Sequence, residues 1–197
     1  PYPTSRKFYK WNSLQVLLHF NPRYRLKYLF IGIILWSIGK MAQIKKADGQ
    51  IEINCNANKL FDLWAHNTLQ ICKICPDKFP KLELLQGDNC HTPGAVICWT
   101  FTTPVDGKQE FVKTVLEEID EKNRSVIYNP TEGEMMDKYF KTWREGPEFI
   151  PKGENWCIAK WKVVEYETKC ADAPDPKLYI DFLLDSIKDV AHHISSA

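Results

Sequence analysis

The sequence predicts an α+β domain in which one long C-terminal helix lies on a curved antiparallel sheet. The first observation is an amphipathic stretch at the end of the chain, from Pro174 to Ile194. The second is a run of short β-rich segments, separated by turn-forming residues, which occupies most of the chain before it. A long apolar stripe must be buried against something, and the apolar face of a sheet supplies that surface.

The C-terminal stretch carries both a helix start signal and an apolar face. Asp175 is a good N-cap, and Pro176 suits the first helical position, where its missing N–H costs nothing. Asp181 and Asp185 leave the outer side charged. At 1.5 Å per residue, the helix is roughly 30 Å long. The apolar stripe contains the residues spaced three and four apart, namely Tyr179, Phe182, Leu183, Ser186, Ile187, Val190 and Ile194.

Residues 1–40 differ from the rest of the chain. They are basic and aromatic, contain no acidic residue, and end in an apolar run from Tyr28 to Ile38. That run is too short to cross a bilayer, which needs about 20 apolar residues. We interpret residues 1–40 as a mis-assigned upstream extension outside the fold, and Met41 as the natural start of a domain spanning residues 41–197. A targeting segment is the alternative, because the pattern also resembles a signal peptide.

The composition indicates one well-buried domain. A chain of 197 residues with an apolar fraction of 44% is ordinary for a globular protein. The net charge of +1 gives no reason to expect nucleic acid or an anionic membrane as partner. The seven cysteines are odd in number and irregularly spaced. We therefore expect free thiols and a cytoplasmic location rather than a disulfide framework.

The domain begins with a strand and two short helices. Isoleucines alternate with polar residues between positions 44 and 54, which is typical of a half-buried strand. Asn56 or Asn58 can cap the first short helix. Thr68 can cap the second, over residues 69–75, which a proline ends.

Six further strands with short connections are expected, and the last five form an antiparallel meander. Their ranges are 81–86, 95–102, 108–119, 125–129, 135–144 and 156–167, with a loop over 145–155. A hairpin turn at Asp106-Gly107 joins two of them. We expect a bulge at Val163-Val164, because Trp161 and Tyr166 both face inward only if strict alternation breaks there.

Several short motifs occur in a fixed order along residues 41–197. They are MAQI at 41–44, ICPDKFPK at 74–81 followed by Gly87-Asp88, EEIDEKNRSVIY at 117–128, Glu132-Gly133, AKW at 159–161, EYE at 165–167 and PDPKLYIDF at 174–182. Together with the order of elements, these motifs resemble the Bet v I / major latex protein family of plants, which includes the pathogenesis-related class-10 proteins. The similarity is closest to the major latex branch, and residues 1–40 have no counterpart in it.

The resemblance implies a helix-grip, START-like fold, in which a curved seven-stranded antiparallel sheet grips the C-terminal helix around a partly apolar cavity. It also implies binding of small hydrophobic plant molecules such as hormones, flavonoids, sterols or alkaloids, in association with defence and stress responses. The loop at 87–94 has fewer glycines than that of many relatives, which speaks against a phosphate-binding role. We expect a monomer with a small hydrophobic ligand, no cofactor and no stable membrane span.

Aromatic residues are the best candidates for the cavity lining, and plain core packing is their alternative role. Ser186 can offer its hydroxyl to a ligand or bond back to the carbonyl four residues earlier. A one-residue error in strand register would turn any strand residue to the other face. The candidate ligand-binding residues are Phe61, Trp99, Phe101, Tyr128, Tyr139, Trp161, Tyr179, Phe182, Leu183 and Ser186.

Two patterns suggest metal binding, but both have simpler explanations. Cys72 and Cys75 with Cys90-His91 have zinc-like spacing. We expect the first two thiols to pack against the core instead, so no metal site is predicted. His192 and His193 are adjacent on a helix, point about 100° apart and cannot clasp one ion.

A cavity enzyme of norcoclaurine-synthase type, acting on alkaloid-like substrates, is the second hypothesis. It needs a Lys or a carboxylate facing inward beside a Tyr. Tyr128, Tyr139, Lys138 and Glu165 are suitable residue types, although Lys and Glu on an antiparallel sheet usually form the solvated face. No catalytic residue is assigned, because the family's catalytic set has no residue-by-residue match here. Ribonuclease activity ranks third, since no base or phosphate cradle is predicted.

Overall fold

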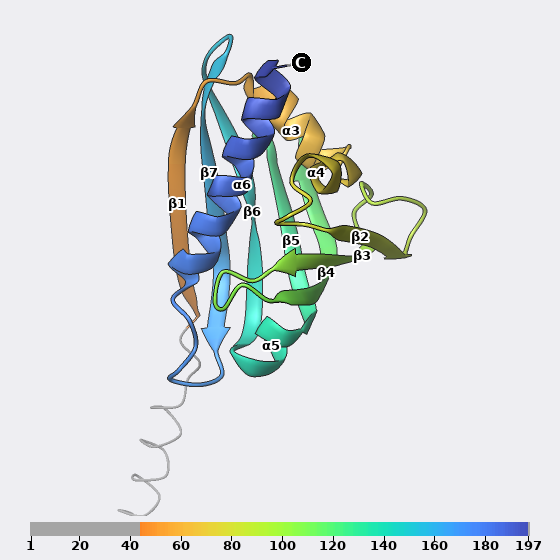
Figure 1. Cartoon of the computed structure of the whole chain (residues 1–197), viewed down its shortest axis with the longest axis vertical. Coiled ribbons are helices and arrows are strands. Elements are labelled where there is room, and N and C mark those ends of the chain that lie inside the picture. Colours follow the sequence, from red (N-terminus) through yellow and green to blue (C-terminus); the bar gives the residue numbers. More distant parts are fainter. Residues whose placement is uncertain (1–43, 197) are drawn as a thin grey trace, which may run out of the picture. The chain divides into compact units, whose positions relative to one another are not determined.

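The computed structural model describes residues 44–196, which form one curved sheet and four helices (Figure 1). The strands are β1 (Lys45–Ile53), β2 (Lys81–Gln86), β3 (Val96–Thr102), β4 (Gln109–Asp120), β5 (Ser125–Gly133), β6 (Phe140–Gly153) and β7 (Trp156–Thr168). The helices are α3 (Ala57–Ala65), α4 (Leu69–Ile74), α5 (Glu134–Lys138) and α6 (Pro176–Ser196). The expectations for residues 1–40 and for a start at Met41 lie outside the described residues.

The seven strands form one antiparallel sheet in the order β1-β7-β6-β5-β4-β3-β2. This confirms the predicted seven-stranded sheet and its five-stranded meander, which runs from β3 to β7. The first strand pairs with the last, so β1 and β2 are the two edges. Helix α6 lies along the sheet over β1 and β7, while α3 and α4 lie near its C-terminal half (Figure 1).

The predicted bulge in β7 is confirmed. Glu165 pairs with Arg144 and Val163 pairs with Glu145, so Val164 is the extra residue in the ladder. The shift brings Trp161 and Tyr166 to the same side of the sheet, where Trp161 is buried and Tyr166 packs against the core. A bulge of this kind bends the strand, as a curved sheet requires.

Helix α6 begins as predicted and is buried over a wider face. The N–H of Lys177 donates to Oδ1 of Asp175 at 2.9 Å, which confirms Asp175 as the cap. Ile180 and Leu184 are also buried, beyond the predicted stripe. Their contact depends on Gly49 of β1, where a Cβ would lie 2.7 Å from Ile180 and 3.0 Å from Leu184.

Two predictions between residues 134 and 155 were wrong. Residues 134–138 form the short helix α5 rather than a strand, and the expected loop over 145–155 is mostly the second half of β6. Proline usually marks a loop or a sheet edge, because it cannot donate to the ladder. Here Pro147 and Pro151 fit inside β6, since only two residue pairs join this strand to β5 in the described ladder.

The structure has the free thiols that the cysteine pattern of the sequence predicts. All seven are free thiols, and four of them are buried. Within residues 44–196, no helix is both long and apolar enough to cross a bilayer.

Candidate functional site

A cavity lies between α6 and the inner face of the sheet. It has a volume of about 80 Å³ and is partly open to solvent. Its lining is mostly aromatic and aliphatic. The lining residues are Trp64, Ile71, Phe79, Trp99, Phe101, Val112, Thr114, Tyr128, Pro130, Met135, Glu145, Trp161, Tyr179, Phe182 and Leu183.

Most of the predicted ligand-binding residues line this cavity. Those that do are Trp99, Phe101, Tyr128, Trp161, Tyr179, Phe182 and Leu183. The stripe of the helix predicted Tyr179, Phe182 and Leu183, whereas the strand residues were chosen as aromatic residues whose face depended on the strand register.

Three predicted residues lie outside the lining. Phe61 is buried on α3, where its ring meets the edge of His66 at a centroid distance of 5.8 Å. Tyr139 ends α5 rather than lying on a strand, and its ring contacts Phe140. The hydroxyl of Ser186 donates to the carbonyl of Phe182 at 2.8 Å, which is the second of the two roles expected for it.

Several lining residues were missed for identifiable reasons. Met135 lies in the segment wrongly predicted as a strand, and Pro130 lies one residue beyond the predicted end of the strand at 125–129. Glu145 lies in the segment predicted as a loop. Phe79 lies between α4 and β2, where no periodic pattern indicates a face. The sequence predicted that Trp64 lies on the apolar side of the first short helix. No sequence pattern near Trp64 indicates that this side faces the cavity.

Aromatic rings form one wall of the cavity by edge contacts. The ring of Phe79 lies 5.5 Å from those of Trp99 and Phe182, and Phe182 lies 6.4 Å from Phe101. T-shaped and tilted arrangements of this kind each stabilise by about 0.5–1.5 kcal/mol beyond area burial. Trp99 and Phe182 remain partly exposed, because the space beside them is empty.

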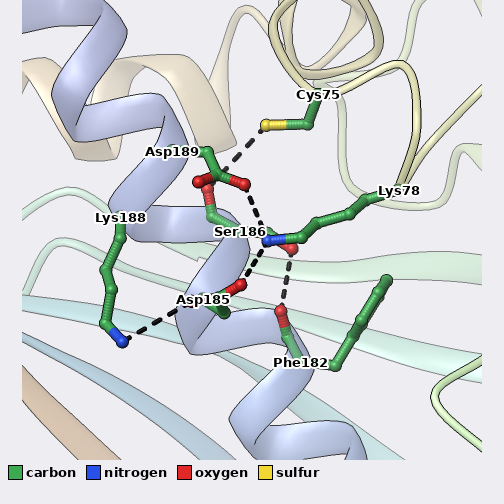
Figure 2. Close-up of polar contacts among 7 residues, drawn as sticks. All are labelled: Cys75, Lys78, Phe182, Asp185, Ser186, Lys188 and Asp189. Carbon is green, nitrogen blue, oxygen red and sulfur yellow. Dashed lines mark hydrogen bonds and ion pairs between the residues drawn. The ribbon is translucent and has the colours of Figure 1, made fainter.

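The segment that carries Phe79 is fastened to α6 by polar contacts (Figure 2). The ammonium of Lys78 donates to Asp185 at 2.6 Å and to Asp189 at 2.7 Å. The thiol of Cys75 donates to the carbonyl of Ser186. Burial lowers the pKa of Lys78, but the hydrogen bonds and charges of the two carboxylates outweigh it, so the net pKa is raised. The Lys78 ammonium in turn lowers the pKa of Asp185.

Glu145 is the one carboxyl group among the residues that line the cavity in the described chain. The indole N–H of Trp161 donates to its Oε2 at 2.9 Å. Burial raises the pKa of Glu145 to about 7, although the indoles of Trp161 and Trp143 act in the opposite direction. Gly146 lets β6 approach β5 here, since a Cβ would lie 1.7 Å from the carbonyl oxygen of Val126.

The other polar groups of the cavity are hydroxyls. Tyr128 donates its hydroxyl to the carbonyl of Trp64 at 3.0 Å. The hydroxyls of Thr114 and Tyr179 are buried and have no hydrogen-bond partner within residues 44–196. Burial raises the pKa of both Tyr128 and Tyr179, so both phenols stay neutral and able to donate.

Of the four residues considered for catalysis, namely Tyr128, Tyr139, Lys138 and Glu165, only Tyr128 lines the cavity. The ammonium of Lys138 pairs with Glu134 at 2.6 Å, and Glu165 lies 3.7 Å from Arg144. Neither residue contributes to the lining, which contains one carboxyl and two phenols. In the described part of the chain, no three His, Cys, Asp or Glu side chains are grouped so as to hold a metal ion.

A curved antiparallel sheet that grips a long C-terminal helix, with a cavity between them, defines a helix-grip protein. Residues 42–197 match the model of the pathogenesis-related protein Bet v 1 family. The chain therefore belongs to the Bet v 1 family.

Relatives with similar sequences are major latex proteins. MLP-like protein 43 of Arabidopsis thaliana is 26% identical over 152 residues, which cover 77% of this chain and 93% of the relative. Major latex protein 146 of Papaver somniferum is 26% identical over 149 residues, covering 74% of this chain and 88% of the relative.

Solved structures show the same arrangement. Major latex-like protein 151 of Panax ginseng superposes with a TM-score of 0.69 at 25% identity, covering 76% of this chain and 97% of the ginseng protein. Norcoclaurine synthase of Thalictrum flavum, in complex with dopamine and hydroxybenzaldehyde, reaches a TM-score of 0.58 at 19% identity, covering 77% of this chain and 88% of the synthase. The latter likeness concerns the fold alone.

Proposed function

We propose that this protein binds small hydrophobic plant molecules, such as hormones, flavonoids, sterols or alkaloids, in the cavity under α6, in association with defence and stress responses. The observation that carries this proposal is an aromatic-lined cavity between a long helix and a curved sheet. Ligand sites are typically concave and apolar, with a few polar groups that fix orientation. The membership of the Bet v 1 family supports the same role.

The size of the cavity constrains how a ligand binds. About 80 Å³ is well below the roughly 300–1,000 Å³ of sites for drug-sized molecules. One ring of a ligand fits the enclosed part, and the rest extends into the mouth or displaces the partly exposed side chains of Phe182 and Leu183. We propose the cavity-lining aromatic residues as the ligand contacts, with Leu183 beside them.

The proposal is tested with an apolar fluorescent probe such as ANS. We expect the folded protein to bind the probe and flavonoids or plant hormones to displace it. Leu183→Trp fills the cavity from α6 and should abolish binding. Leu178→Trp is the matched control, because Leu178 is 41% exposed on the same helix and absent from the lining. Equal probe binding by both variants and the parent protein would contradict the proposal.

We also propose the cellular setting that the sequence indicates. The free thiols fit a reducing, cytoplasmic environment. The net charge of +1 fits a protein without a nucleic-acid partner. We further propose that the protein is a monomer without a cofactor and that residues 1–40 lie outside the ligand-binding domain. Size-exclusion chromatography with light scattering tests the oligomeric state.

A cavity enzyme is the second candidate, and Glu145 is the observation that favours it. Glu145 lies opposite Tyr128 in the β5–β6 ladder, and burial raises the pKa of its carboxyl to about 7, as a general base at neutral pH requires. The fold is shared with norcoclaurine synthase. Incubation with an arylethylamine and an aldehyde, followed by mass spectrometry, tests this candidate. Product formation that Glu145→Gln abolishes would establish it, and absence of product would exclude this reaction.

A further inference from the structure

The mouth of the cavity lies between α6 and the strands β3 and β4. Four apolar residues of the lining remain only partly buried, and these are Trp99, Val112, Phe182 and Leu183. Phe182 and Leu183 lie on α6, whereas Trp99 of β3 pairs with Val112 of β4. Helix α6 packs mainly against β1 and β7, towards the other edge of the sheet, and therefore leaves this side of the cavity open.

One segment joins the two sides of this mouth, and we call residues 75–79 the strap. The strap follows α4 and ends at Phe79, which lines the cavity and is 6% exposed. The ring of Phe79 lies 5.5 Å from the ring of Trp99 on β3 and 5.5 Å from that of Phe182 on α6. The position of the strap therefore decides whether Phe79 fills the space between the two sides.

On the β3 side, hydrogen bonds to its backbone hold the strap. The N–H of Thr102 donates to the carbonyl of Lys78 at 2.9 Å, and the hydroxyl of Thr102 donates to the carbonyl of Asp77 at 2.6 Å. Directly after the strap, β2 pairs with β3 from Lys81 onward. Because these contacts continue into the ladder of the sheet, this side of the strap is the fixed one.

On the α6 side, side chains hold the strap (Figure 2). The ammonium of Lys78 donates to Asp185 at 2.6 Å and to Asp189 at 2.7 Å. The thiol of Cys75 donates to the carbonyl of Ser186 at 3.9 Å, and a thiol is a weak donor. The side chains of the two aspartates are 55% and 50% exposed, so water and salt compete with the ion pairs. This side of the strap is therefore the one that can be released.

Release of Lys78 from α6 leaves neither aspartate in an apolar environment. The ammonium of Lys188 lies 3.5 Å from Oδ1 of Asp185 on the same helix, so it can keep that carboxylate paired. Asp189 is half exposed and can be hydrated. Separating these ion pairs therefore costs little, in contrast to breaking a pair inside the core.

We propose that the strap is the gate of the cavity and that the ion pairs of Lys78 with Asp185 and Asp189 are its latch. When the ion pairs separate, the strap moves away from α6 about its attachment to β3 and withdraws Phe79 from its aromatic neighbours. A ligand larger than the enclosed 80 Å³ then enters or leaves. This inference rests on the proposed function, because it concerns the regulation of the same cavity.

A gate of this kind has a distinct kinetic signature. Weakening the latch raises the fraction of open molecules in both the free and the ligand-bound protein. The association and dissociation rate constants then rise by the same factor, and their ratio, Kd, stays the same. Loss of a residue that only stabilises the bound ligand acts mainly on the dissociation rate constant and weakens the affinity.

Stopped-flow fluorescence with N-phenyl-1-naphthylamine tests the proposal on the full chain. This apolar probe is uncharged at pH 7, so changes of charge and salt act on the protein. In Lys78→Met at low salt, we expect both rate constants to rise roughly fivefold, while Kd stays within about twofold of the parent value. Lys78→Arg retains the charge and should stay close to the parent protein. Lys177→Met is the matched control, because its ion pair with Asp181 lies within α6, and it should leave both rate constants unchanged.

Salt provides a test that needs no substitution. Raising NaCl from about 0.02 M to about 0.5 M shortens the Debye length from about 20 Å to about 4 Å. Both rate constants of the parent protein should therefore rise toward those of Lys78→Met. Lys78→Met lacks the latch, so its rate constants should respond much less.

The outcomes separate the gate from the proposed function. Unchanged rate constants in Lys78→Met would overturn the gate, and so would a rise in the dissociation rate constant alone. In both cases the probe binds, so the proposed function stands. Absence of a salt response in the parent protein would also overturn the gate, and this arm decides the question even if Lys78→Met does not fold. Failure of the parent protein to bind the probe would overturn the proposed function and the gate together.

Discussion

Two groups of aromatic rings beneath α6 differ in how completely they fill space. The aromatic cluster consists of Phe140, Trp143, Tyr166 and Tyr179. The cavity wall consists of Phe79, Trp99, Phe101 and Phe182. In the aromatic cluster, Phe140 and Trp143 are 0% exposed, and the neighbouring centroids are 4.5–6.3 Å apart. In the cavity wall, the neighbouring centroids are 5.5–6.4 Å apart and the rings border empty space.

The difference follows from position in the sheet. The cluster stands mainly on β6 and β7, which have neighbours on both sides, and α5 packs near it. The cavity wall stands on β3, on α6 and on the segment before β2. β3 also has a strand on each side, but α6 packs mainly against β1 and β7 and leaves the rings of the cavity wall less covered. Residues of the same type thus form solid core in one place and border a cavity in another, and the predictions below test that division.

The largest effect is expected from truncation in the aromatic cluster. Trp143→Ala removes a fully buried ring from the core, so it should lower the free energy of unfolding by about 3–5 kcal/mol. Trp99→Ala is the matched variant in the cavity wall, and it should cost at most about half as much, because its ring already borders empty space. Urea denaturation measures both, and equal losses would remove the distinction between the two regions.

The next effect concerns the charge that lines the cavity. Since burial raises the pKa of Glu145 from 4.5 to about 7, the folded protein binds more protons than the unfolded chain between these values. Glu145 therefore makes the protein less stable as pH rises through this window. Glu145→Gln should stabilise the protein at pH 8 by up to about 3 kcal/mol.

Below about pH 4, the carboxyl is protonated in both states, and the two proteins should be equally stable. Urea denaturation at pH 4, 6 and 8 measures the change. A constant difference across this range would show that the carboxyl titrates normally in the fold.

A smaller effect is expected where the cavity wall is fastened to α6. Lys78→Met removes the ion pairs to Asp185 and Asp189 and should cost about 1 kcal/mol at low salt, because the side chain of Lys78 is only 22% exposed. Lys177→Met breaks an exposed pair with Asp181 on the same helix and should cost little. Added salt should reduce the loss of stability in Lys78→Met. Equal stabilities of the two variants would mean that the ion pairs of Lys78 with Asp185 and Asp189 contribute nothing to the free energy of unfolding.

The smallest loss of stability, below about 1 kcal/mol, is expected for Phe182→Leu, because the ring is only partly buried and the replacement remains apolar. The cavity should widen, so a two-ring probe such as biphenyl should gain affinity relative to toluene. Phe140→Leu, in the aromatic cluster, should leave that ratio unchanged. Calorimetric titration with both probes measures the ratio, and an unchanged ratio in Phe182→Leu would place the ligand elsewhere.

The sequence predicted the elements whose signals are local and periodic. Asp175 and the spacing of the C-terminal stripe located α6, and failed alternation beside Val163 located the bulge in β7. It did not reveal α5, which has five residues and no repeating pattern. It also missed Glu145, because two prolines made a central strand resemble a loop, and its burial depends on β5 and α6 rather than on its sequence neighbours.

Intermolecular NOEs between a bound aromatic probe and isotope-labelled leucine methyl groups test most directly whether the space under α6 binds ligands. Leu183 lines the cavity, whereas Leu178 is exposed on the same helix. We expect NOEs from the probe to the methyl groups of Leu183 and none to those of Leu178. NOEs to Leu178 without any to Leu183 would contradict ligand binding between α6 and the sheet.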